Sequence, residues 1–117
     1  MITLYGISNC DTVKKARAWL TAQGLAHRFV DFKKDGLPGD RLPAWCDAVG
    51  WATLLNRRGT TWRQLPPDQQ AAVTDAASAQ AVMREQPSVV KRPVVEWPSG
   101  AITVGFDAAA WAALAAA

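Results

Sequence analysis

The sequence predicts an α/β fold in which four strands form one mixed sheet. Two observations predict it. A short strand, a helix and a second strand follow one another between residues 2 and 32, which is the order of a parallel βαβ unit. Near the C-terminus, two more strand-like runs are joined by a Pro-Ser-Gly turn and followed by an alanine-rich helix. The stretch between these halves has helical patterns but no strand pattern.

The first half is predicted element by element. Residues 2–6 (ITLYG) have the composition of a short strand closed by glycine. A helix is expected to begin near Asp11, among residues of the N-cap type, and to end near Gly24. Residues 27–32 (HRFVDF) predict the second strand. The helix has one apolar face, formed at i, i+3 and i+7 by Val13, Ala16 and Leu20.

The middle of the chain predicts helices only. Residues 40–50 have one helical pattern, and residues 50–56 (GWATLLN) can form another helical turn. The run 68–86 is rich in Ala and Gln, so we expect two helices there with a break near residues 74–78. Pro87 ends this run. The apolar face of the first pattern consists of Leu42, Trp45, Cys46 and Val49.

The second half predicts a hairpin and a last helix. Strands are expected at residues 93–97 and 101–106, and Asp107 is placed to cap a final helix over 108–117. A βαβ half and a ββα half describe a thioredoxin-like sheet. We therefore expect one domain over residues 1–117, with a thioredoxin-like core at about 1–36 and 88–117 and a helical insert at about 37–87.

Composition narrows the functional classes. The formal charge of +3 without a basic tail gives no reason to expect direct nucleic-acid binding, and no apolar run is long enough for a membrane span. Met1 leads directly into a strand without a leader pattern, so a cytoplasmic protein is expected. In that reducing compartment both cysteines are expected to be free. A monomer is also expected. His27 is far from other potential ligands, so no metal site and no tightly bound cofactor are expected. The six tryptophans are spread along the chain and are interpreted as packing residues.

Cys10 is the main candidate nucleophile. The predicted turn from the first strand into the helix places it at the helix N-terminus, where backbone N–H groups and the helix dipole favour a thiolate. Asp11 opposes this effect, so a basic partner is needed, and Lys14 lies one turn further on. The alternative is a buried structural thiol. A Cys-x-x-Cys site is excluded because Val13 occupies the second position, and Cys46 is expected to pack on an apolar helix face.

Two basic segments are further candidates. Arg92 and Pro93 lie at the start of a predicted strand, and Arg92 taken alone fits a surface charge. Arg57 and Arg58, followed by glycine, fit either a cradle for a carboxylate or oxyanion or a solvated loop. Arg63 is expected to be solvated or in a local salt bridge.

Four segments together resemble the arsenate reductase/Spx superfamily, and most closely its YffB-like branch. They are LYGISNCDTVKKARAWL, GWATLLNRRGTTWRQL, VVKRPVV and VGF, in the family's order over essentially the whole chain. The resemblance implies a nucleophilic cysteine at Cys10, a cis proline at Pro93 beside it, and an arginine at Arg92 that serves its anion.

The sequence departs from the arsenate reductases at two places. Their arginine from the insert aligns with Asn56, and their arginine in the last strand region aligns near Gly105. A pocket of three arginines is therefore incomplete here.

The first functional hypothesis is a glutathione-dependent thiol reductase. Cys10 would attack a disulfide or a small oxyanion, and glutathione or another small thiol would resolve the adduct. Its anion-binding candidates are Asn9, Lys14, Arg57, Arg58, Arg92 and Pro93. Arsenate reduction is a narrower version of the same steps. The alternative from another class is an Spx-like regulator that binds a transcription complex without turnover.

Overall fold

The computed structural model describes residues 1–116, and the chain divides into two compact units. One unit, here the thioredoxin-like unit, consists of Met1–Gly36 and the chain from Arg92 onward. The other, the helical unit, is Leu37–Lys91. None of the helices in the described part of the chain is long and apolar enough to cross a membrane.

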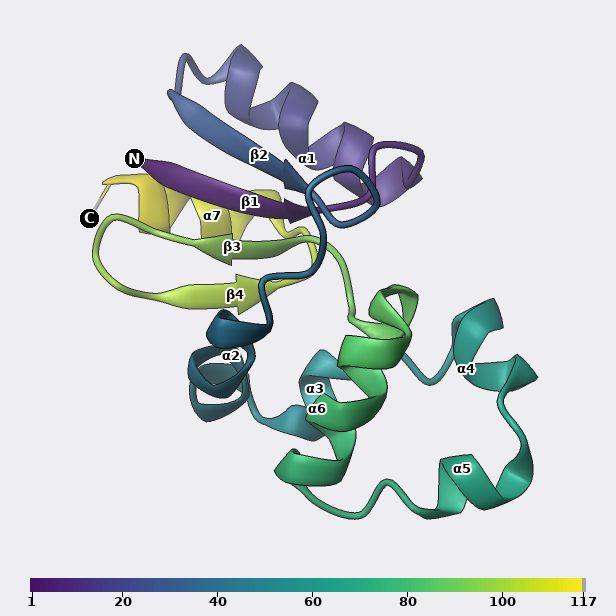
Figure 1. The fold of residues 1–117 in the computed structure, drawn as a ribbon. Helices are drawn as coiled ribbons and strands as arrows, with labels where there is room; N and C mark the ends of the chain where they lie inside the picture. The colour runs from purple at the N-terminus through teal and green to yellow at the C-terminus, as the bar shows by residue number, and fades with distance from the viewer. Residues whose placement is uncertain (117) are drawn as a thin grey trace. The chain divides into compact units, whose positions relative to one another are not determined.

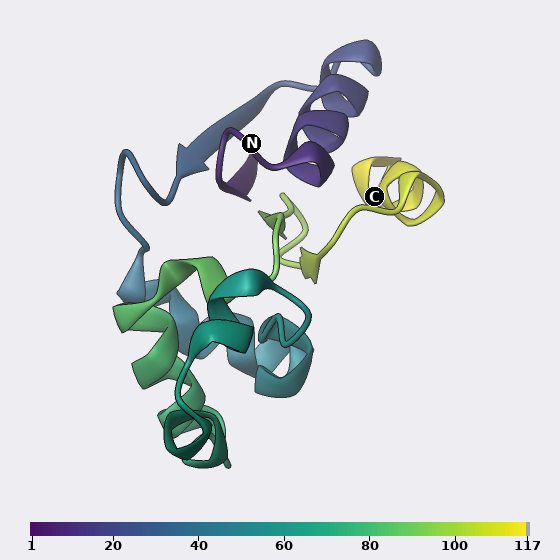
Figure 2. The same ribbon diagram turned by 90° about the vertical axis from the view of Figure 1, so that its right-hand side faces the viewer.

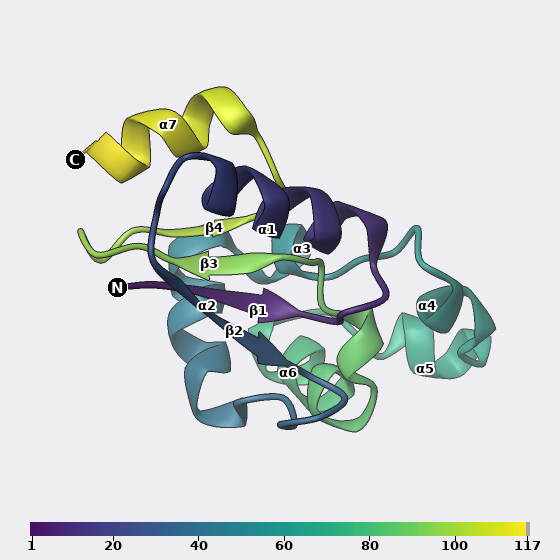
Figure 3. The ribbon, with the colours of Figure 1, turned by 90° about the horizontal axis from the view of Figure 1, so that it is seen from above.

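The thioredoxin-like unit has the predicted order of elements (Figure 1). They are β1 (Ile2–Gly6), α1 (Asp11–Ala22), β2 (His27–Asp31), β3 (Val94–Glu96), β4 (Ile102–Val104) and α7 (Ala108–Ala116). The strands form one sheet in the order β2-β1-β3-β4 (Figure 3). β1 pairs in parallel with β2 and antiparallel with β3, and β3 pairs antiparallel with β4. The predicted four-stranded mixed sheet is confirmed.

The core of this unit lies on one face of the sheet, which α1 and α7 cover together (Figure 2). Trp111 of α7 is 1% exposed and meets the rings of Trp97 and Phe106 edge-on, at centroid distances of 5.2 and 4.8 Å. The predicted cap of α7 is present, since the Ala110 N–H donates to Asp107 Oδ1 over 3.1 Å. The buried members of this core are Ile2, Leu4, Val13, Ala16, Leu20, Val95, Trp97 and Trp111.

β1 and α1 approach each other most closely at Gly6. A Cβ built at Gly6 would lie 2.7 Å from Cγ2 of Val13, which is shorter than a van der Waals contact. Val13 is fully buried, so it occupies this space and belongs to the core. The residue that stands where a Cys-x-x-Cys site has its second thiol is therefore a packing residue, as predicted.

The helical unit is built from short helices, shown in blue to green in Figure 1. They are η1 (Gly39–Arg41), α2 (Leu42–Val49), α3 (Trp51–Leu54), α4 (Thr60–Gln64), α5 (Pro67–Ala71), α6 (Ala76–Glu85) and η2 (Pro87–Val89). The expected break between two helices lies at Asp75, whose side chain accepts from the Ser78 N–H in a capping box. Thr60–Gln64 form α4, a helix that the sequence analysis did not predict.

The end of the helical unit is held by an isolated antiparallel bridge between Leu55 and Val90. The Asn56 N–H donates to the Val89 carbonyl over 2.7 Å, and the Lys91 N–H donates to the Leu54 carbonyl over 2.7 Å. Residues 88–91 therefore pack with the helical unit in the structure.

Candidate functional site

Cys10 is the N-cap residue of α1. Its backbone is extended (φ −89°, ψ 125°), and its carbonyl accepts the first bond of the helix from the Lys14 N–H over 2.9 Å. The Cys10 N–H closes a turn onto the Ile7 carbonyl over 3.2 Å. The turn from β1 to α1 thus presents a half-buried thiol at the positive end of the helix, as the sequence predicted.

The surroundings of Cys10 favour its thiolate. Burial raises the pKa of the thiol, but hydrogen bonds from the Val13 N–H, the Arg92 side chain and the Thr12 N–H, with the charge of Arg92, lower it below its ordinary value. The thiol makes no capping hydrogen bond of standard geometry within the described residues. The N–H groups of Val13 and Thr12 therefore lower the pKa by stabilising the thiolate, which is a stronger hydrogen-bond acceptor than the thiol.

Arg92 and Pro93 reach Cys10 because β1 and β3 are antiparallel neighbours. Tyr5, near the end of β1, pairs with Val94, the first residue of β3. The segment before β3 therefore lies beside the turn after β1. The Arg92–Pro93 peptide bond is cis, as the resemblance implied, and Pro93 is buried, with its carbonyl accepting from the Gly105 N–H over 2.9 Å.

Asp31 holds the turn that leads to Cys10. It is 9% exposed, ends β2 and pairs in register with Gly6, the last residue of β1. Its carboxylate accepts from the Lys33 N–H over 2.9 Å. The Lys33 bond is the main cause of a lowered pKa of Asp31, which burial opposes, and bonds from the hydroxyl and N–H of Ser8 and from the Lys34 N–H lower it further.

Asn9 and Lys14, the other two candidates near Cys10, both have exposed side chains. Asn9 lies in the turn before the thiol, and Lys14 lies in the first turn of α1. The structure thus brings Cys10, Arg92 and Pro93 together in one unit and places two exposed polar residues close by in the chain.

Arg57 and Arg58 lie in the helical unit and line a pocket of about 520 Å³ together with Asn56 and Lys91. The guanidinium of Arg57 lies near the rings of Trp51 and Trp62, at 5.6 and 5.9 Å from their centroids. The Arg58 N–H donates to Asn56 Oδ1 over 3.2 Å. The pocket therefore carries three cationic side chains, of which the sequence had indicated two.

Cys46 packs as predicted. It is 7% exposed on the buried face of α2, and burial raises the pKa of its thiol. The Gln80 side chain and Arg84 lower this pKa and Asp47 raises it, but burial dominates. Both cysteines are free thiols. Cys46 is therefore a weaker nucleophile than Cys10 at neutral pH.

Two residues of these sites were missed from the sequence. Asp31 resembles an ordinary acid before a Lys-Lys-Asp-Gly turn, and only the register with Gly6 places it at the turn of Cys10. Lys91 joins Arg57 and Arg58 through the Leu55–Val90 bridge, which no local pattern indicates. Over residues 1–116, no three His, Cys, Asp or Glu side chains gather where they could hold a metal ion.

The geometry agrees with a comparison to known proteins. The model of the ArsC family matches residues 5–114. The chain belongs to the ArsC family. A curated protein of Haemophilus influenzae, known only as an uncharacterised protein, is 41% identical to this ArsC-family chain over 107 residues, which is 92% of each chain.

Two solved structures also cover nearly all of this ArsC-family chain. A YffB protein is 46% identical, with a TM-score of 0.92 over 97% of this chain and 98% of its own. An arsenate reductase (ArsC) related protein from Brucella melitensis is 50% identical, with a TM-score of 0.73 over 96% of this chain and 92% of its own. The predicted membership of the superfamily, close to its YffB-like branch, is confirmed.

Proposed function

We propose that this ArsC-family protein is a glutathione-dependent thiol reductase that uses Cys10 as its only nucleophile. Membership of the family supports a thiol-dependent oxidoreductase in general terms. The observation that carries the finer proposal is the set of groups around Cys10. Two backbone N–H groups and the Arg92 side chain favour its thiolate, while Val13 stands where a second thiol would resolve the adduct.

The reaction proceeds by thiol–disulfide exchange. The Cys10 thiolate attacks a substrate disulfide, the new S–S bond joins Cys10 to one half, and the other half leaves as a thiolate. A first glutathione thiolate attacks the Cys10 sulfur, releases the bound half and leaves glutathione on Cys10. A second glutathione attacks that glutathione sulfur and frees Cys10. Two glutathione molecules are thus oxidised to one disulfide for each substrate disulfide reduced.

Each protein group has a separate part in this cycle. Arg92 and the N–H groups of Thr12 and Val13 stabilise the thiolate both as nucleophile and as leaving group. Within the helical unit, Arg57, Arg58 and Lys91 offer cations to which a carboxylate can bind. Arsenate is the less favoured substrate, because Asn56 and Gly105 stand where the resemblance implies arginines.

Mass spectrometry after incubation with oxidised glutathione tests the proposal. We expect one glutathione adduct in the wild-type protein and in Cys46→Ser, and none in Cys10→Ser. An adduct that persists in Cys10→Ser, or a Cys10–Cys46 disulfide in the wild type, would contradict the single-nucleophile cycle. A Cys10→Ser variant that still retains RNA polymerase in a pull-down would favour the alternative hypothesis, an Spx-like regulator that binds a transcription complex without turnover.

A further inference from the structure

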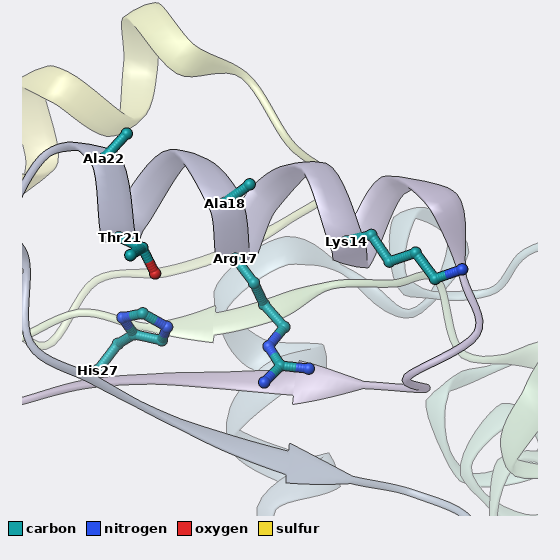
Figure 4. A pocket seen from close by; sticks show the side chains of 6 residues that line it. All are labelled: Lys14, Arg17, Ala18, Thr21, Ala22 and His27. Carbon is teal, nitrogen blue, oxygen red and sulfur yellow. The ribbon is translucent and has the colours of Figure 1, made fainter.

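One face of α1 and the start of β2 form a groove on the thioredoxin-like unit (Figure 4). Its volume is about 520 Å³. Its lining consists of Lys14, Arg17, Ala18, Thr21, Ala22 and His27. The five helical positions recur at three- and four-residue spacing, so they form one stripe along α1. Two of the lining side chains are cationic and none is acidic.

Lys14 is the groove residue nearest in the chain to Cys10, which is the N-cap residue of the same helix. Lys14, Arg17 and Thr21 are three and four residues apart, which places them on one side of α1. Figure 4 shows the Lys14 side chain extending towards the first turn of α1, where Cys10 is the N-cap residue. At a rise of about 1.5 Å per residue, the stripe from Lys14 to Ala22 is roughly 12 Å long. A ligand that fills it must be extended.

Arg17 is held in place for an anion. Its Cζ lies 4.2 Å from the centroid of the Phe29 ring, and Phe29 packs against the core. Figure 4 shows the Arg17 side chain crossing from α1 towards the sheet. A guanidinium stacked on a ring keeps its edge N–H groups available, so it can bind a carboxylate through paired hydrogen bonds.

The far end of the groove offers a hydrogen-bond acceptor. His27 Nδ1 lies 2.9 Å from the Leu25 carbonyl oxygen, and because a carbonyl only accepts, Nδ1 carries the proton. In the neutral ring Nε2 is then an acceptor. Figure 4 shows a ring nitrogen of His27 facing along the groove towards Arg17, and the Thr21 hydroxyl pointing towards the His27 ring. This end of the groove can therefore accept a hydrogen bond from a backbone N–H of a ligand.

We propose that this groove binds an acidic peptide segment of the substrate, next to the disulfide that Cys10 attacks. Lys14 and Arg17 bind carboxylates of the segment, and His27 accepts a backbone N–H. A single phosphate would be too short to fill a stripe of this length, and it has no donor for His27 once fully ionised. The proposal rests on the proposed role of Cys10 as nucleophile but is independent of glutathione.

A pair of activated peptides tests the groove. Each peptide carries one cysteine as a mixed disulfide with thionitrobenzoate, flanked on one side by glutamates in one peptide and by glutamines in the other. Attack by Cys10 joins the peptide sulfur to Cys10 and releases thionitrobenzoate as a coloured thiolate, so absorbance gives the rate constant. All proteins carry Cys46→Ser, which leaves Cys10 as the one thiol. We expect the glutamate peptide to react faster, and the difference to shrink with added salt.

Matched variants separate the groove from general charge. Arg17→Gln and Lys14→Gln are each expected to lower the glutamate-to-glutamine rate ratio about two- to fivefold, the range for one exposed ion pair. Lys15→Gln and Arg28→Gln remove the same charge from exposed residues outside the groove, and they are expected to keep the ratio. An equal ratio in the groove and control variants would overturn the proposal.

A second measurement keeps the groove testable if Cys10 reacts with neither peptide, a result that would contradict the proposed function instead. Amide spectra of Cys10→Ser are recorded during titration with the glutamate peptide in its unactivated form. We expect shifts at Lys14, Arg17, Thr21 and His27, which Arg17→Gln removes and Arg28→Gln keeps. Shifts confined to other residues, or no shifts, would overturn the proposed groove.

Discussion

The side chain of Arg92 lowers the pKa of the Cys10 thiol against the opposing effect of burial, although the two residues lie near opposite ends of the chain. The antiparallel pairing of β1 with β3 creates this relationship. Tyr5 pairs with Val94, so the end of β1 and the start of β3 lie side by side at the same end of the sheet. Arg92 supplies to the thiolate both a donor and a full positive charge.

Arg92→Ala should therefore slow the alkylation of Cys10, and more so with an anionic reagent than with a neutral one. Loss of the charge and the donor raises the pKa of Cys10, which lowers the thiolate fraction for both reagents. Loss of the attraction acts on the anion alone. Rates with iodoacetate and iodoacetamide at neutral pH measure both effects. Equal slowing of the two, or the same pattern in the exposed control Arg28→Ala, would contradict this role.

The lowered pKa of Cys10 predicts a stability that rises with pH. A thiol whose folded pKa lies below its unfolded value stabilises the fold fully above the unfolded pKa, and this stabilisation is lost as pH falls through the folded pKa. Urea unfolding of Cys46→Ala and Cys10→Ser/Cys46→Ala between pH 6 and pH 9.5 checks the sign. The free energy of unfolding of Cys46→Ala should increase relative to that of Cys10→Ser/Cys46→Ala as pH rises. A constant difference would contradict the lowered pKa.

The two cysteines should also differ in reactivity. Cys10 is half-buried with a lowered pKa, whereas Cys46 is buried with a raised pKa. Iodoacetamide at neutral pH should modify Cys10 first, because its lowered pKa gives a larger thiolate fraction and its thiol is the less buried of the two. Peptide mapping after short incubations measures both rates. Faster labelling of Cys46 would show that the thiolate of Cys10 is not favoured.

Asp31→Asn should slow Cys10 alkylation through the turn that precedes the thiol. The N–H and hydroxyl of Ser8 help to lower the pKa of this carboxylate, and a neutral amide oxygen would attract these donors less strongly. Ser8→Ala should have a smaller effect in the same direction, because the backbone N–H bond remains. Asp68→Asn, at an exposed acid in α5, is the control for loss of charge. An unchanged rate in Asp31→Asn would contradict the positioning role.

The same carboxylate should matter less in acid. The folded pKa of Asp31 lies below its unfolded value, so its stabilisation is present above the unfolded pKa and is lost as pH falls through the folded one. The stability difference between wild type and Asp31→Asn should shrink below about pH 4, the ordinary range of an aspartate. Urea titrations at several acidic pH values measure it. A difference that grows on acidification would reverse the expected sign.

Gly6→Ala should destabilise the protein by about 1–3 kcal/mol, which is typical of overpacking a core. The added methyl would lie 2.7 Å from Cγ2 of the fully buried Val13. Val13→Ala removes that atom, so the double variant should lose less stability than the two single changes added together. Urea unfolding of the four proteins gives the coupling energy. Simple additivity would show that the backbone moves to make room.

Local patterns were sufficient for most of the fold. β1 has the predicted bounds, and α1 begins at Asp11 as expected. Such features depend on residues close in the chain: an apolar face at helical spacing, N-cap residues, and glycine after a strand. α4 was missed because Thr60–Gln64 has no acidic first turn and no buried residue, which are the usual signals of a helix.

Local sequence patterns also predicted one part of the candidate site and missed another. The position of Cys10 at a helix N-terminus follows from the local sequence, and so does the packing role of Val13. Arg92 became a candidate only through the resemblance, because its neighbours in the chain give no hint of a thiol nearby. Arg57 and Arg58 were recognised as a possible cradle, but Lys91 was not.

The sequence by itself determined the order of the four strands with their two helices, the cysteine at the start of α1 and the lack of a second thiol one turn later. Only the tertiary structure decided what surrounds that cysteine. The pairing of Tyr5 with Val94 brings Arg92 to the sulfur, and the pairing of Gly6 with Asp31 brings a buried carboxylate to the preceding turn. The physical reason is that sheet register joins residues far apart in the chain, which local propensity does not encode.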